Sequence, residues 1–105
     1  MSYKNYSILD EEINKTIHEP ARLKILVYLS MVDNCDFVYL MYKTKLSKGN
    51  LSSHLSKLEA AGFIDIKKEF VEKIPRTLTS ITDSGKEAFS KYKMNMMKLL
   101  SSTHL

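Results

Sequence analysis

A chain of 105 residues, with 44% hydrophobic and 27% charged residues, has the length and composition of one small globular domain. No apolar run approaches the roughly 20 residues that a membrane-spanning helix needs, and the first ten residues lack the pattern of a secretion signal. The single cysteine, Cys35, cannot form a disulfide within the chain, so we expect a reducing, cytoplasmic environment.

The positive charge is concentrated in the middle third of the chain. Residues 1–42 carry a net charge of −2, residues 43–76 carry +4 and residues 77–105 carry +2, against +4 for the whole chain. A basic region favours a polyanionic partner, most often nucleic acid, although a solvated surface is the alternative explanation.

Two helices are predicted before residue 33. The first begins at Ser7, which starts a capping-box-like pattern, and the segment His18-Glu19-Pro20 ends it. Its apolar residues recur every four positions: Leu9, Ile13 and Ile17. Pro20 suits the first position of a second helix, because the first helical residue does not need its N–H. The buried side of this second helix is expected to hold Ile25, Leu26, Leu29 and Val32.

A short third helix and a longer fourth helix follow. Asp36 can cap the third helix, and its apolar residues are Phe37, Leu40 and Met41. Lys45 to Ser47 form a tight turn, and Ser47 is a good N-cap for the fourth helix. Gly62 closes that helix as a residue that needs a positive φ. The core stripe of the fourth helix is Leu51, Leu55 and Leu58.

The pattern then changes to that of strands. Residues 63–67 and 77–81 alternate between apolar and polar residues and are rich in strand formers. Between them, Glu69 to Arg76 are expected to form a long, charged loop with Pro75 near its tip. Thr82 or Asp83 caps a final helix that ends near Leu100. The predicted fold is mainly α with a β-hairpin, in the order α-α-α-α-β-β-α.

The third and fourth helices form a helix-turn-helix. At about 100° per residue, the leucines of the fourth helix lie on one side, and small polar residues lie opposite. Serine is a poorer helix former than Glu or Lys, so a serine-rich outer side indicates a purpose other than helix stability. Small side chains let a helix enter a DNA major groove, where Asn50 can pair with adenine and Ser53 with several base edges. The alternative is an amphipathic core helix with a solvated serine face.

Three stretches of the chain resemble MarR/ArsR-type winged helix-turn-helix regulators. They are the segment Leu46-Ser47-Lys48-Gly49-Asn50-Leu51-Ser52-Ser53-His54-Leu55-Ser56-Lys57-Leu58 through Ile64, the segment Glu19-Pro20-Ala21-Arg22-Leu23-Lys24-Ile25-Leu26, and residues 76–86. The resemblance covers residues 17–100. It implies a dimer that represses or activates transcription, with the fourth helix in the major groove and the hairpin, or wing, on the minor groove or backbone.

On this basis we expect one domain, 1–105, with the helix-turn-helix at about 36–61, the wing at about 63–81 and a dimerisation helix at about 83–100. The expected DNA-contacting residues lie on the turn, the outer side of the fourth helix and the wing: Lys45, Ser47, Lys48, Gly49, Asn50, Ser52, Ser53, His54, Ser56, Lys57, Lys67, Lys68, Lys73 and Arg76. Arg76 is the candidate for a narrow minor groove.

The last helix has an apolar seam with the 3, 4, 3 spacing of a heptad: Phe89, Tyr92, Met96 and Leu99. We expect it to form the dimer interface, with help from Leu9 and Ile13 of the first helix. The alternative is packing of this seam onto the chain's own first helix.

No pattern predicts an enzyme or a cofactor. His18, His54 and His104 lack metal-ligand spacing, and the Cys-x-Cys pair of ArsR-type metal sensors is missing. No effector can be named from the sequence. The expected partners are therefore double-stranded DNA and a second copy of the chain. The competing hypothesis is a winged-helix protein–protein interaction module without DNA binding.

Overall fold

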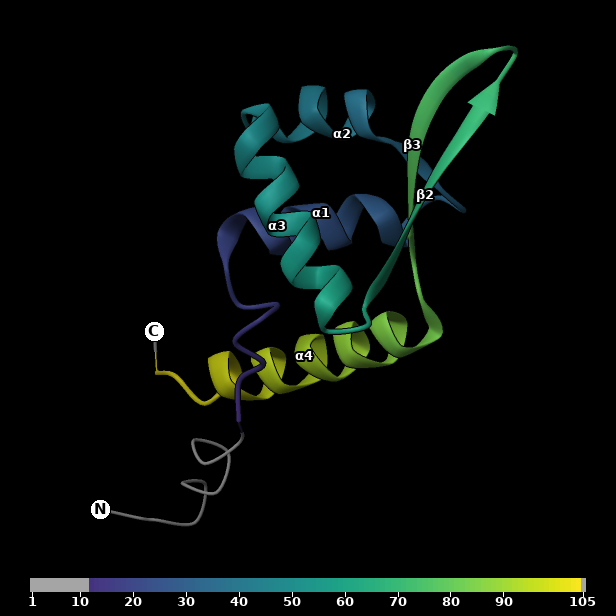
Figure 1. Ribbon diagram of the computed structural model, residues 1–105. Helices are drawn as coiled ribbons and strands as arrows, with labels where there is room; N and C mark the ends of the chain where they lie inside the picture. Colours follow the sequence, from purple (N-terminus) through teal and green to yellow (C-terminus); the bar gives the residue numbers. More distant parts are fainter. Residues whose placement is uncertain (1–11, 105) are drawn as a thin grey trace.

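The computed structural model describes residues 12–104. These form four helices and three strands: α1 (Pro20–Ser30), β1 (Cys35–Asp36), α2 (Phe37–Thr44), α3 (Lys48–Ala60), β2 (Ile64–Val71), β3 (Ile74–Ile81) and α4 (Asp83–Ser101). The strands form an antiparallel sheet in the order β1-β3-β2. In Figure 1, α1, α2 and α3 gather into one group, α4 runs beneath them, and the β2–β3 hairpin projects beyond them. The mainly helical winged helix-turn-helix fold is confirmed.

The core lies where α1, α2, α3 and the base of the hairpin meet. Its fully buried apolar side chains are Ile17, Ile25, Leu26, Leu29, Leu40, Leu51, Leu55, Leu58 and Ile64. Burying one such side chain contributes about 1.5–3 kcal/mol, so these residues hold the helix-turn-helix in place. Val32, which was expected to be buried, is instead exposed after the end of α1.

Side-chain caps fix where each helix begins. Asp36 accepts a hydrogen bond from the Val38 N–H at 2.7 Å, and Ser47 accepts one from the Asn50 N–H at 3.2 Å. Thr82 likewise caps α4. These three caps were predicted from the sequence. The cap of α1, Glu19, was not predicted, although Pro20 was placed at the first position of this helix.

The expected first helix is not formed in the part that the structure describes. Lys15 to Ile17 make a turn, in which the Asn14 side chain accepts from the N–H groups of Thr16 and Ile17 at 3.0 and 3.1 Å. An Asn side chain that satisfies the backbone in this way competes with helix formation. Ile17 is nevertheless fully buried. Ser7 and Leu9 lie outside the described residues.

The wing spans the predicted residues, but its strands are longer and its turn is shorter than the sequence predicted. Strands β2 and β3 pair continuously from Ile64↔Ile81 to Val71↔Ile74. The prediction of a long loop over residues 69–76 was therefore wrong. Only Glu72 and Lys73 form the turn, with φ values of 52° and 66°. Positive φ at both central residues is the geometry of a type I′ hairpin, which usually signals itself by Asn-Gly or Asp-Gly. This sequence carries neither residue pair at the turn, which is why the turn was missed.

Two glycines position the end of α3 and the start of α4. Gly62 follows α3 with a φ of 80°, as predicted. A Cβ on Gly85 would clash with the carbonyl oxygen of Phe63, so only glycine lets α4 approach the start of the wing this closely. Thr82 reinforces the junction by donating to the Gly62 carbonyl at 2.6 Å.

Candidate nucleic-acid interface

The outer side of α3 is a continuous surface of small polar residues. Leu51, Leu55 and Leu58 are buried, which turns the opposite side of the helix to solvent. The exposed residues of the turn and of α3 include Lys45, Ser47, Lys48, Gly49, Asn50, Ser52, Ser53, Ser56 and Lys57. All nine were predicted as contact residues, and the structure brings them to one side of the molecule.

His54 is the exception on α3, because it is half-buried against α1. Its Nδ1 lies 3.1 Å from Arg22 Nη1 and 3.6 Å from Glu19 Oε2. A guanidinium only donates hydrogen bonds, so Nδ1 accepts and the ring proton resides on Nε2. His54 therefore ties the middle of α3 to the start of α1 rather than facing outward.

Glu19 is held in its charged form at this junction. Partial burial raises its pKa, but the backbone N–H groups of Arg22 and Ala21 and the positive charges of His54, in its protonated form, and of Arg22 outweigh burial and lower the pKa below its ordinary value. The carboxylate accepts from the Arg22 N–H at 2.8 Å. The charged form of Glu19 thus stabilises the first turn of α1 next to α3.

A cleft of about 530 Å³ separates α3 from the wing. Lys48, Ser52, Ser56 and Glu59 line it from α3, and Ile66, Lys68 and Thr77 line it from the wing. A lysine therefore stands on each wall, and the two elements expected to contact DNA share one concave surface, whose lining also includes the apolar residues Phe37 and Leu55.

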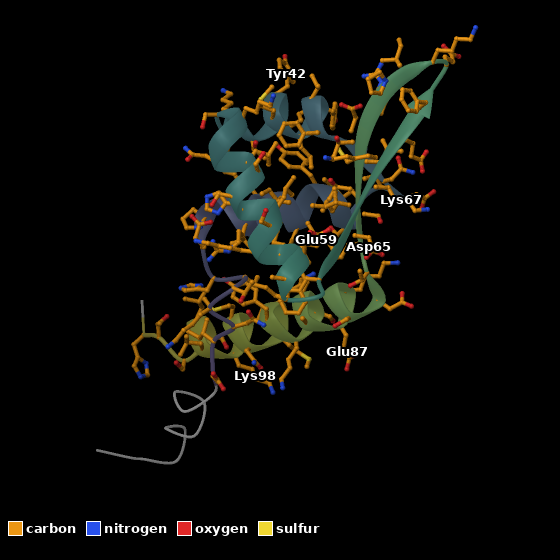
Figure 2. The ribbon with its side chains drawn as sticks, viewed as in Figure 1. Tyr42, Glu59, Asp65, Lys67, Glu87 and Lys98 are labelled. Atoms are coloured by element: carbon orange, nitrogen blue, oxygen red, sulfur yellow. The ribbon has the colours of Figure 1, made fainter. Side chains whose placement is uncertain are left out.

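The pairing of the hairpin decides which wing residues face this cleft. Neighbouring residues of a strand point to opposite sides, and directly paired residues share a side. Lys68 pairs with Thr77, and both line the cleft, so the next pair on that side is Phe70 with Pro75. Lys67 and Arg76 belong to the opposite side, and Figure 2 shows Lys67 pointing away from α3.

Arg76 has a partner within the chain. Its Nη1 lies 3.3 Å from Asp36 Oδ2, the carboxylate that also caps α2. This contact joins β3 to the start of α2, which gives Arg76 a structural role that the sequence did not reveal. The residue that sequence reasoning missed is Phe70, which is 77% exposed near the wing tip. Strand alternation from Ile64 and Ile66 would have placed it on the cleft side.

A second surface, between α1 and α4, is apolar. A groove of about 540 Å³ is lined by Leu23, Val27, Ser30, Phe89, Tyr92, Lys93, Met96, Met97 and Leu100. Of the predicted seam, Phe89 and Met96 form its wall and are half-buried, as is Leu99. Tyr92 is turned inward, with its hydroxyl 2.8 Å from His18 Nδ1. The exposed apolar side chains are Val27, Met97 and Leu100. Ile13 is partly buried and packs against the core, and Leu9 lies outside the described residues.

Cys35 is buried in β1. Burial raises the pKa of its thiol, and the neighbouring charge of Asp36 raises it further. Among residues 12–104, no three His, Cys, Asp or Glu side chains gather as metal ligands would. No helix in this part of the chain is long and apolar enough to cross a membrane.

A helix-turn-helix whose apolar side is buried, and whose second helix exposes small polar side chains beside a two-stranded wing, defines the class of winged-helix DNA-binding proteins. The chain belongs to the family described as the winged helix DNA-binding domain, whose model matches residues 21–100.

The relatives agree with this family. The uncharacterized protein MJ0432 of Methanocaldococcus jannaschii is 38% identical over 85 residues, which cover 81% of this chain and 92% of that protein. A transcriptional regulator homologue from Pyrococcus horikoshii OT3 superposes with a TM-score of 0.83 at 26% identity, over 94% of this chain and 95% of that one. A MarR-family regulator from Silicibacter pomeroyi shares the fold, with a TM-score of 0.63 at 19% identity, over 90% of this chain and 62% of its own.

Proposed function

We propose that this chain is a sequence-specific, double-stranded DNA-binding transcriptional regulator that acts as a homodimer. α3 enters the major groove, and the β2–β3 wing contacts the minor groove or the backbone. The observation that carries the proposal is the outer side of α3, where seven exposed residues between Lys48 and Lys57 are small, polar or basic. The Pyrococcus horikoshii homologue, described as a transcriptional regulator, supports the same function.

Within α3, base reading and backbone contact fall to different residues. Asn50 and Ser53 are exposed and carry short side chains that pair with base edges. Lys45 and Lys48 flank the N-terminus of α3, where free N–H groups also favour a phosphate. Gly49 leaves open space where a side chain would stand, since a Cβ there meets no atom within 4 Å. The helix can thus approach the base edges closely.

On the wing, the side that faces the cleft makes the DNA contacts. Lys68 supplies charge there and Lys73 supplies it at the turn. Phe70 and Pro75 present an apolar surface next to Lys68. Apolar side chains at such positions pack against sugars or wedge between base steps of the minor groove. The two cationic residues on the opposite side, Lys67 and Arg76, contribute less, because Arg76 is already engaged by Asp36.

The groove between α1 and α4 is the proposed dimer interface. Three exposed apolar residues, Val27, Met97 and Leu100, border it, and a second copy would cover them. A two-fold dimer presents two copies of α3 to two half-sites about 10–10.5 base pairs apart, or a multiple of that spacing.

The competing function is a protein–protein interaction module. The polar α3 surface argues against it, because the centres of protein interfaces are depleted of charge and enriched in aromatic residues. The test is selection of genomic DNA fragments on the purified protein, followed by fluorescence anisotropy on a selected and a scrambled duplex. A regulator prefers the selected duplex by at least 1,000-fold. Equal, weak binding to both duplexes would support the interaction module instead.

A further inference from the structure

A second basic cleft lies on the side of α3 away from the wing. It measures about 440 Å³ and is built by the turn before α1, by α1 itself and by the C-terminal half of α3. Its lining residues are Lys15, Thr16, Arg22, Lys57, Ala60 and Ala61. Half of these residues are cationic, and the two alanines leave the floor open.

The guanidinium of Arg22 is held in one orientation. Its Nε donates to the Thr16 carbonyl at 2.5 Å, Nη1 donates to His54 Nδ1 at 3.1 Å, and Nη2 makes a longer 3.5 Å contact with the Lys15 carbonyl. All three acceptors are neutral. A guanidinium has five N–H donors, so two remain after these contacts.

The positive charge of this cleft is only partly compensated. Across residues 12–104, no carboxylate oxygen lies within 4.0 Å of the Arg22 guanidinium. Glu19 is the nearby acidic residue, and its carboxylate is occupied as the cap of α1 and faces His54. Lys15 and Lys57 are exposed at the rim. Three cations against one engaged carboxylate leave an excess that an anion would relieve.

We propose that this cleft binds a phosphate-type oxyanion. The fork of Arg22 offers two oriented donors, a geometry that matches phosphate oxygens, and Lys15 and Lys57 supply charge. The phosphate has two possible sources, namely the DNA backbone or a free phosphate in solution. The inference that the phosphate comes from DNA rests on the proposed function. A helix in the major groove has a phosphate strand on each side, so the wing would hold one strand and this cleft the other.

The free-phosphate arm is a calorimetric titration of the DNA-free protein with inorganic phosphate at constant ionic strength. The test variant is Lys15→Gln combined with Lys57→Gln, which leaves the contacts of Arg22 in place. The matched control is Lys91→Gln combined with Lys98→Gln, two exposed lysines of α4. Saturable binding that the test variant weakens at least tenfold, and the control leaves unchanged, supports a free-phosphate site. Arg22→Lys keeps the charge but loses the fork, and it is expected to weaken the same binding at least fivefold.

The DNA arm is a salt titration of duplex binding with the same variants. Each phosphate contact adds about 0.9 to the slope of log K against log salt, so the single variant Lys57→Gln lowers the slope by about 2 in a symmetric dimer. The preference for the selected duplex stays unchanged. A changed slope without free-phosphate binding assigns the site to the DNA backbone. Failure of both arms overturns the proposal. If the unmodified protein binds no DNA, the proposed function fails, and the phosphate titration alone decides this site.

Discussion

The exposed sides of α3 and α4 differ, although both helices bury one apolar side. α3 turns Asn50, Ser53 and Ser56 to solvent, whereas α4 exposes Met94, Met97 and Leu100 among its lysines. A helix that only needs solubility is covered with Glu and Lys. The two helices depart from that pattern in opposite directions, one towards small polar residues and the other towards large apolar ones. Opposite chemistry predicts different partners, namely nucleic acid for α3 and a second copy of the chain for α4.

The largest effect is expected from a charge in the apolar groove. Met97 is 63% exposed and borders the groove, so Met97→Glu leaves the protomer folded but places a charge in the proposed dimer interface. We expect monomers in sedimentation and a loss of DNA affinity of roughly 100-fold or more, because the second half-site is no longer linked. Met96→Glu should have the same effect, but Met96 also packs against the core.

The control for this prediction is Met94→Glu, since Met94 is 55% exposed on α4 and does not line the groove. It should stay dimeric. A monomeric unmodified protein at micromolar concentration would contradict the dimer.

The next largest effect concerns base reading by α3. Asn50→Ala and Ser53→Ala should each reduce discrimination between the selected and scrambled duplexes by about 1–3 kcal/mol, because each removes a base-edge contact. The slope of log K against log salt should barely change. Ser90→Ala, at an exposed serine of α4, is the matched control and should leave both quantities unchanged. A changed salt slope with unchanged discrimination would show that α3 contacts the DNA backbone rather than the bases.

A smaller effect separates the two sides of the wing. Lys68→Ala should lower the salt slope by about 2 for a symmetric dimer, because one phosphate contact is lost in each copy. Lys67 is the neighbouring residue on the opposite side of the strand, so Lys67→Ala removes the same charge and should change the slope less. Phe70→Ser should weaken binding without changing the slope. Equal slopes for the two lysine variants would show that the side of the wing does not matter.

The smallest effect is on stability and depends on pH. The pKa of Glu19 is lowered by folding, so the charged carboxylate stabilises the native state above its ordinary pKa of 4.5, and this contribution is lost as the pH falls through the lower, native value. Glu19→Gln should lower the free energy of unfolding by about 1 kcal/mol near neutral pH, as the loss of a helix cap does. Urea unfolding at several pH values should show the difference shrinking in acid. A difference that persists unchanged at low pH would rule out the charge as its cause.

The fold could be predicted from the sequence where the signals are local. Asp36, Ser47 and Thr82 cap their helices within three residues of themselves, and Gly62 ends α3 by its own backbone conformation. The leucine stripe of α3 fixes its buried side in the same way. The exposed side of α3 therefore followed from the sequence almost completely.

The features that could not be predicted depend on contacts between residues that are distant in the sequence. β1 forms only because Cys35 pairs with Thr79. His54 contacts Arg22, which is 32 residues away in the sequence, and Arg76 contacts Asp36, which is 40 residues away. The direction in which each wing residue points depends on the pairing of β2 with β3, and the turn at Glu72 and Lys73 that sets this pairing carries no glycine or asparagine. Side-chain chemistry alone does not reveal such contacts.

Chemical footprinting tests the central claim most directly. Dimethyl sulfate methylates guanine N7 in the major groove and adenine N3 in the minor groove, so it reports each groove separately. On a selected duplex, we expect two regions of N7 protection about 10–10.5 base pairs apart, or a multiple of that, from two copies of α3. Flanking N3 protection should weaken in Phe70→Ser, while the N7 protection remains. A bound duplex whose N7 positions all stay reactive would contradict the placement of α3 in the major groove.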